Sequence, residues 1–419
     1  MTTVRRGAAA LAAAAVLGTG FAPAALAAPS PSPSPSADLP AGLYGTGDPT
    51  YDGVWRQSLA LLAQDTAGVT PADQAVAFLT GQQCADGAFA AYRPDPSAAC
   101  DAKTKPDTNS SGAAAQALAA LGGQDAAVAK TVGWLKSVQN DDGGWGFYPG
   151  DASDANSTSA VIGALAAAGE KPAEVTSKGG RSPYDSLLTF ALPCSGDDGG
   201  AFEYQKGTPG FIADSTAAAV TAANGRGLVV PPATGTGGQD AECGSGADLA
   251  DAARNGAAYL AGEMAGTGHL DTPPMPGAED SDPAPDYGNT ADAVVALSAQ
   301  DVPRQAAKPL DWLKKNGASW AEQAGPAAWA QLVLAAHATG TDPRDFGGTD
   351  LVAGLNATGP APKSGDASSQ PEANGSEAAG EEAGDDDGGS LTTWWIVGVF
   401  FIAAVGVGFL FSGRRKNQG

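Results

Sequence analysis

A repeat of 56 residues constrains the fold of this chain more than any other feature of its sequence. Three glycine-rich acidic turns, QQCADGAF, VQNDDGGWGF and PCSGDDGGAF, place Asp86, Asp142 and Asp198 56 residues apart. A fourth, degenerate turn is GTGHL at 266–270. A fixed long period is typical of repeat proteins, in which each unit buries its apolar face against its neighbours. We therefore expect one continuous core built from similar units.

A second polar pattern follows each of these turns. The four copies are DTNSSG from Asp107, DANSTS from Asp154, IADSTA from Ile212 and DYGNTA from Asp286, and each opens an alanine-rich stretch. Asp, Asn, Ser and Thr are preferred at helix N-caps, where they accept hydrogen bonds from free backbone N–H groups. The first turn is therefore predicted to end one helix, and the second pattern to start the next.

Counting these segments predicts two alternating sets of six helices. The first set is rich in alanine and poor in charge, which favours burial on all sides: 52–64, 109–121, 157–168, 214–224, 289–299 and 325–338. The second set is amphipathic: 71–82, 125–138, 183–191, 248–263, 305–316 and 346–355. No alternating β-branched run indicates a sheet. The predicted fold class is all-α, an α6/α6 double-ring toroid that spans residues 39–359.

This organisation resembles the α/α-toroid superfamily, which includes terpenoid cyclases, protein prenyltransferases and cobalamin carriers such as intrinsic factor and transcobalamin. The sequence QNDDGGWG at 139–146 is close to the Q-x-x-x-G-x-W repeat of the squalene cyclases and prenyltransferases. The resemblance implies that Gln139 closes the end of an outer helix and that Trp145 packs between neighbouring helices. Asp142 and Gly144 belong to the same structural repeat.

The same resemblance provides a test for catalysis. Squalene–hopene-type cyclases protonate their substrate with the middle aspartate of D-x-D-D-T-A, and a neighbouring carboxylate assists that acid. In DANSTS both central carboxylates are replaced, and only IADSTA keeps one, Asp214, followed by Ser215. Because an amide cannot deliver the proton, we expect no cyclase activity. The alternative is an isoprenoid cyclase or prenyltransferase-type enzyme that uses Asp214 as its acid.

In a toroid, the N-termini of the inner helices converge at one mouth of the ring. The polar side chains at these four starts would then form a rim that binds a small molecule, with Thr158, Ser215 and Thr290 beside it. The alternative is that each side chain only caps its own helix. The predicted ligand-binding residues are Asp107, Asn109, Asp154, Asn156, Asp214, Asp286, Tyr287 and Asn289.

From this rim we expect a non-catalytic binding protein at the cell surface, similar in plan to the cobalamin carriers. A corrinoid is the candidate ligand and a membrane importer the candidate partner. We expect no cofactor and no metal. The net charge of −23 argues against nucleic acid as a partner.

The ends of the chain predict a membrane-anchored ectodomain. Residues 1–27 read as a signal peptide and 28–38 as a Pro/Ser spacer. At the other end we expect an acidic disordered linker at 360–393, a transmembrane helix at 394–411 and a cytoplasmic tail at 412–419. A buried helix is the alternative for each apolar run. The predicted location is the cell membrane, crossed once, with the ectodomain outside.

Four cysteines fit the oxidising compartment that these ends predict. Three pairings are open. We favour Cys84 with Cys100, which closes one loop, and Cys194 with Cys243 as the remaining pair. A zinc site is the competing interpretation, but C-x2-C spacing is absent and the chain has only two histidines.

Overall fold

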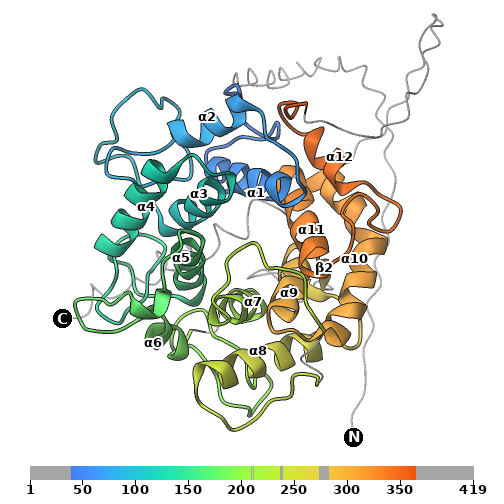
Figure 1. Ribbon diagram of the computed structural model, residues 1–419. Helices are drawn as coiled ribbons and strands as arrows, with labels where there is room; N and C mark the ends of the chain where they lie inside the picture. The colour runs from blue at the N-terminus through green and yellow to red at the C-terminus, as the bar shows by residue number, and fades with distance from the viewer. Residues whose placement is uncertain (1–38, 209, 211, 236–238, 273–282, 365–419) are drawn as a thin grey trace, which may run out of the picture. The chain divides into compact units, whose positions relative to one another are not determined.

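Alternating alanine-rich and amphipathic segments form α-helices throughout the part of the chain that the computed structural model describes. These residues are 39–208, 210, 212–235, 239–272 and 283–364 (Figure 1). The predicted signal peptide 1–27, spacer 28–38, transmembrane helix 394–411 and tail 412–419 lie outside them, as does most of the linker 360–393. None of the helices in the described part has the length and hydropathy that a bilayer span requires.

Six helices form a closed inner ring. Each packs against the next, and the last of them packs against α1, which closes the circle (Figure 1). Small residues permit the close approach: a Cβ atom added at Gly112 would lie 3.0 Å from the carbonyl oxygen of Ala160 on the neighbouring helix. The inner helices are α1 (Gly53–Thr66), α3 (Thr108–Leu121), α5 (Ala155–Ala167), α7 (Ile212–Ala223), α9 (Tyr287–Ala299) and α11 (Pro326–Ala338).

Six further helices surround this ring, and each packs against the inner helix that precedes it in the chain. The all-α prediction and the two alternating sets are therefore confirmed for the described residues. A short 3-10 helix, η1 (Pro172–Glu174), precedes α6. The outer helices are α2 (Asp73–Gly81), α4 (Asp125–Ser137), α6 (Pro183–Leu188), α8 (Leu249–Glu263), α10 (Pro303–Ala324) and α12 (Leu351–Asn356).

Three local predictions differ from the structure. Helix α10 continues past the predicted end at 316, because Gly317 lets it approach Leu332 of α11, whose Cδ2 would lie 3.0 Å from a Cβ at this position. Helix α12 begins five residues later than predicted, because 346–349 form a turn in which Phe346 and Thr349 exchange backbone hydrogen bonds. A two-stranded antiparallel hairpin, β1 (Leu270–Thr272) and β2 (Ala284–Asp286), precedes α9 although no strand was expected.

The first and second polar patterns of each unit are joined by one recurring hydrogen bond. A hydroxyl in the first turns of the inner helix accepts a bond from a backbone N–H of the preceding acidic turn, at 2.9–3.1 Å. The four hydroxyls are fully buried. Thr158 and Thr290 therefore link helix to turn, and do not stand beside an open rim as predicted. The pairs are Ser111 with Phe89, Thr158 with Trp145, Thr216 with Phe202 and Thr290 with Leu270.

The turn at 139–146 shows what the repeat residues do. Gln139 donates through Nε2 to the carbonyl of Gly143 at 2.7 Å, and Asp142 accepts from the N–H of Gly144 at 3.0 Å. Trp145 is fully buried in the core. These contacts hold the turn between α4 and α5.

A segment after α7 crosses the ring at the C-terminal side of its inner helices. The N–H of Leu228 donates to Oε1 of Gln116 on α3 at 2.8 Å, and Gly227 lies against Gly163 of α5. Further along, the N–H of Ala233 donates to the carbonyl of Ala338 at the end of α11. Because the segment touches helices on different sides of the ring, it occupies that end. A binding or catalytic site is therefore expected at the opposite end of the ring, where the inner helices begin.

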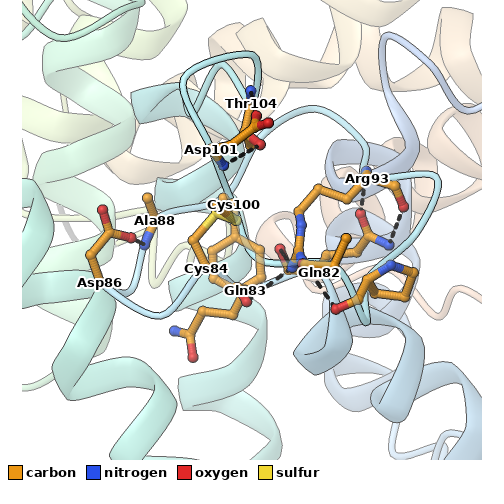
Figure 2. Close-up of a disulfide and its surroundings, with 12 residues drawn as sticks. Gln82, Gln83, Cys84, Asp86, Ala88, Arg93, Cys100, Asp101 and Thr104 are labelled. Atoms are coloured by element: carbon orange, nitrogen blue, oxygen red, sulfur yellow. Dashed lines mark hydrogen bonds between the residues drawn. A yellow bond between two sulfur atoms is a disulfide. The ribbon is translucent and has the colours of Figure 1, made fainter.

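Both predicted disulfides are present. Cys84 pairs with Cys100 and Cys194 with Cys243, each with a Cα–Cα distance of 5.7 Å. The first closes the loop between α2 and α3, and Figure 2 shows it beside Arg93. The guanidinium of Arg93 is buried and donates to five backbone carbonyls of this loop and of the end of α2. The loop is thus fixed by a covalent bond and by one buried cation.

Candidate active site

Two of the predicted rim residues are buried N-caps. Asp107 accepts from the N–H of Ser110 at 2.6 Å, and Asp154 accepts from the N–H of Ser157 at 2.7 Å. Each is 1% exposed. Burial raises the pKa of each carboxyl to about 7, against the opposing effect of the capping hydrogen bonds. Their contacts are those of helix caps, and neither presents a free carboxylate to solvent.

The remaining rim residues lie at the same end of the ring. Asn109 is buried beside the cap of α3. Asp286 caps α9 by accepting from the N–H of Asn289 at 3.0 Å, and the side chain of Asn289 donates to the same carboxylate at 2.7 Å. The starts of consecutive inner helices are also connected, because the N–H of Ala155 donates to the carbonyl of Tyr204 in the next unit.

Asn156 and Asp214 form the central contact of this region. The Nδ2–H of Asn156, on α5, donates to Oδ2 of Asp214, on α7. Both side chains are only partly exposed. The two residues hold equivalent positions in DANSTS and IADSTA, so the repeat itself brings them to the same level of adjacent helices. Sequence reasoning placed both at the rim but did not predict this hydrogen bond.

Two further carboxyls belong to the start of α9, Asp286 as its N-cap and Asp292 within its first two turns. The charge of Asp286 acts on Asp214, and the charges of Asp214 and Asp286 act on Asp292. Gln331 of α11 donates through Nε2 to Asp292, at 3.2 Å to Oδ2 and 3.4 Å to Oδ1. The site therefore draws on α5, α7, α9 and α11. Within the described residues, no group of His, Cys, Asp and Glu is arranged to hold a metal ion.

Burial and mutual repulsion keep protons on these carboxyls. Burial raises the pKa of Asp214 to about 6, the charge of Asp286 raises it further, and the Asn156 hydrogen bond opposes the rise. Burial raises the pKa of Asp292 to about 7, with Asp214 and Asp286 acting in the same direction and Gln331 against it. Near neutral pH the cluster consequently holds protons that exposed carboxyls would have lost.

An aromatic surface borders the cluster. The ring of Tyr287, the first residue of α9, stacks on Trp320 with centroids 5.5 Å apart and lies 4.7 Å from Trp312. Gly288 separates this surface from the carboxyls: a Cβ there would lie 3.8 Å from Trp320 and 3.6 Å from Gln331. Aromatic faces attract cations through their quadrupole.

Asp292 and Gln331 were missed from the sequence. Asp292 directly follows the DYGNTA pattern, in a helix that was predicted to be poor in charge and buried on all sides, and Gln331 belongs to a unit without the pattern. The available signal was a single carboxylate within the apolar run TADAVVALSA. An acidic residue on a buried helix requires a partner, which Gln331 supplies.

Two surface clefts lie elsewhere. One, of about 310 Å³, is lined by Thr66, His337 and Arg344 near the ends of α1 and α11, and another, of about 290 Å³, lies beside α2. Neither contains a carboxyl with a raised pKa. The hydrogen bond between Asn156 and Asp214, and the raised pKa of Asp214 and of Asp292, are the better indication of chemistry.

Known proteins similar to this chain include a drimenyl diphosphate synthase. No family model matches the chain. It is 32% identical over 138 residues to a drimenyl diphosphate synthase of Streptantibioticus cattleyicolor, a match that spans 31% of this chain and 24% of the relative. The chain thus covers about a quarter of the length of that curated relative.

Solved structures with a similar arrangement have low sequence identity. An ent-copalyl diphosphate synthase from Streptomyces platensis is 17% identical with a TM-score of 0.45, over 69% of this chain and 50% of that one. The type II terpene cyclase MstE from Scytonema is 15% identical with a TM-score of 0.40, over 64% and 69% of the two chains. A protein from Actinoplanes is 16% identical with a TM-score of 0.40, over 66% and 74%.

The sequence match to a drimenyl diphosphate synthase agrees with the resemblance to the prenyltransferase and squalene-cyclase α/α-toroid superfamily that the repeats indicated. It also corrects the functional prediction. A non-catalytic, cobalamin-carrier-like binding protein was the wrong expectation, because the relative matched in sequence is a diphosphate synthase. The absence of both central carboxylates from DANSTS suggested an inactive site. The IADSTA copy, however, keeps Asp214, and neighbouring helices place polar groups around it.

Proposed function

We propose that this protein is a terpenoid cyclase-type enzyme that acts on an isoprenoid substrate, with Asp214 as the general acid. The observation that supports the proposal best is the setting of Asp214: it is partly exposed, it accepts a hydrogen bond from Asn156, and burial and the charge of Asp286 raise its pKa to about 6. The similarity to a drimenyl diphosphate synthase favours the same substrate class.

The chemistry begins with one proton transfer. The O–H bond of Asp214 breaks, its proton forms a C–H bond at one carbon of a terminal alkene, and the other carbon becomes a tertiary cation. The next double bond of the substrate then closes a ring onto that cation. The last cation loses a proton to water, and Asp214 recovers its proton from solvent, so the product is an isomer of the substrate.

The residues around Asp214 suit both halves of this step. Before transfer, burial and the charge of Asp286 raise the pKa of Asp214 to about 6, so that the acid holds its proton below that pH. After transfer, the Asn156 N–H stabilises the carboxylate that remains, because a hydrogen bond to the charged form favours it. Tyr287 and Trp320 offer an aromatic surface near the cation.

The test is turnover by the full chain. Prenyl diphosphates of three lengths (geranyl, farnesyl and geranylgeranyl) and squalene are incubated with the purified protein, and products are identified by gas chromatography with mass spectrometry. We expect a cyclic isomer of at least one substrate, and a loss of about 10²-fold or more in Asp214→Asn. The matched control is Asp311→Asn, an exposed carboxyl on α10.

The rate should also depend on pH. Because only the protonated form of Asp214 is active, we expect kcat/KM to fall as the pH rises through about 6. No cyclic product from any of the four substrates, or full activity in Asp214→Asn, would overturn the proposal.

A further inference from the structure

The segment that follows α7 is held against both sides of the ring. We call residues 226–235 the crossing segment (Figure 1). Near its start the N–H of Leu228 donates to Oε1 of Gln116 on α3 at 2.8 Å. Further along, the N–H of Ala233 donates to the carbonyl of Ala338 at the end of α11, at 3.0 Å. The polypeptide therefore extends across the C-terminal end of the ring and contacts helices that are not neighbours.

The crossing segment packs closely against α3 and α5. A Cβ added at Gly163 of α5 would lie 2.7 Å from the Cα of Gly227, and a Cβ at Gly227 would lie 2.1 Å from Oε1 of Gln116. The side chain of Gln116 is 4% exposed, and its Nε2 donates to carbonyls of both α3 and α5. Val230 is buried as well. The segment is therefore part of the packed interior at this end of the ring.

The repeat defines how far the crossing segment reaches into the ring. Gln116 is the ninth residue of α3 and Gly163 the ninth of α5, so both contacts lie at the same level. Asn156, which donates to Asp214, is the second residue of α5. Seven residues (163 − 156) with a rise of about 1.5 Å each place the segment about 10 Å from the level of that hydrogen bond. A ligand that extends from Asp214 into the ring meets polypeptide within this distance.

We propose that the crossing segment is the floor of the substrate site and selects isoprenoid substrates by chain length. This inference deepens the proposed function and rests on it for the class of substrate. The sequence LVV at 228–230 is apolar, as contact with a hydrocarbon chain requires. A chain that extends from Asp214 gains apolar burial with each added carbon until it reaches the floor. A longer chain must bend, or leave its end in the N-terminal mouth, and gains no more.

The first measurement is the affinity for saturated alkyl diphosphates, which have no alkene for Asp214 to protonate. Decyl, pentadecyl and eicosyl diphosphate, each below the concentration at which it forms micelles, are titrated into the full chain by isothermal calorimetry. In the wild-type protein we expect the affinity to rise and then to fall with length, because the longest chain exceeds the depth above the floor. A steady rise to eicosyl diphosphate, or no binding of any of the three, would overturn the inference.

A pair of glycine variants tests the crossing segment itself. Gly163→Ala brings a methyl group against the Cα of Gly227 and should displace the segment outwards. Gly133→Ala is the matched control, because Gly133 also lies within a helix, α4, and no atom lies within 4 Å of its Cβ position. In Gly163→Ala we expect the affinity for eicosyl relative to decyl diphosphate to rise by about tenfold. The control should keep the wild-type ratio. An unchanged ratio in Gly163→Ala would contradict the proposal.

Hydrogen–deuterium exchange reports the position of the crossing segment without a ligand. The N–H of Leu228 should exchange slowly in the wild-type protein and about tenfold faster in Gly163→Ala, because displacement breaks its bond to Gln116. Unchanged exchange in that variant would show that the segment does not rest on α5, and the inference would then be wrong. If Gly163→Ala fails to fold, Gln116→Leu removes the acceptor for Leu228 and should change the same affinity ratio.

The two proposals fail in different ways. If the protein converts no prenyl diphosphate but its affinity for the alkyl chains depends on length as described, the floor stands and the proposed function is wrong. If Asp214→Asn abolishes turnover and the length dependence is absent, the function stands and the floor is wrong. Where both hold, Gly163→Ala should also raise kcat/KM for geranylgeranyl diphosphate relative to geranyl diphosphate.

Discussion

The indole Nε1–H of Trp145 donates to the carbonyl oxygen of Leu135, at 2.8 Å, and so joins the repeat turn to the last turn of α4. The side chain is fully buried. A bond from a turn to the helix that precedes it fixes the direction in which the chain leaves that helix.

Two replacements of Trp145 should reduce stability by different amounts. Trp145→Phe leaves the Leu135 carbonyl without its donor, and we expect a loss of about 1–3 kcal/mol in the free energy of unfolding. Trp145→Ala also leaves a cavity, and the expected loss is about 3–5 kcal/mol. Urea denaturation measures both, with the exposed Tyr51→Phe as control. Equal losses in the two Trp145 variants would show that the hydrogen bond, and not the ring volume, dominates.

Gly143 should not tolerate a side chain. Its φ is +92°, and a Cβ would lie 2.2 Å from the carbonyl oxygen of Ser182 at the start of α6. Gly150 offers a matched control, because its φ is +88° and no atom lies within 4 Å of its Cβ position. We expect Gly150→Ala to cost about 1–2 kcal/mol for the backbone alone, and Gly143→Ala to cost clearly more. Similar thermal melting of the two variants would contradict the close approach of turn and helix.

The buried hydroxyls that link turn to helix should each contribute to stability. Thr158→Val removes the acceptor for the N–H of Trp145 at nearly constant volume, so we expect a loss of about 1–3 kcal/mol. Thr221→Val is the control, because its hydroxyl bonds only to the carbonyl of Ala217 within the same helix. If both substitutions have the same small effect in chemical denaturation, the link between turn and helix adds nothing.

Stability should increase as the pH falls from 8 towards 5. Asp154 has a folded pKa of about 7, above its ordinary value of 3.8, so the native state holds a proton that the unfolded chain has lost in this range. The native state is therefore favoured at lower pH, by up to about 1.4 kcal/mol for each unit of pKa difference. Asp154→Asn keeps the N-cap and should flatten this part of the pH profile, measured by denaturation at several pH values. An unchanged slope in that variant would argue against a buried protonated Asp154.

Much of the fold could be read from the sequence because its units repeat. The capping residues of DANSTS mark the start of α5, and the glycine-rich turns mark the ends of α2 and α4, so local chemistry was sufficient there. The extent of α10 was not accessible in the same way. Gly317 looks like a helix end, but it is a point of close approach to α11, and this depends on tertiary packing.

The site was only half predictable for a similar reason. Asp214 and Asn156 belong to the repeated pattern, and comparison of the copies found both. Asp292 and Gln331 meet only because α9 and α11 pack side by side. Their sequence separation and the absence of the pattern around Gln331 gave no reason to connect them. The replaced carboxylates were visible from the sequence, but the hydrogen bonds between Gln331 and Asp292 were not.

The contact between α1 and α11 sets a limit on how this architecture can vary. In an open-ended array a unit can be gained or lost at either end, since each one contacts only its two neighbours. Here α1 and α11 pack against each other and close the ring, so deletion of a single unit would change the curvature at every interface. Length variation should therefore be tolerated in the surface loops between units, and the number of units should stay fixed.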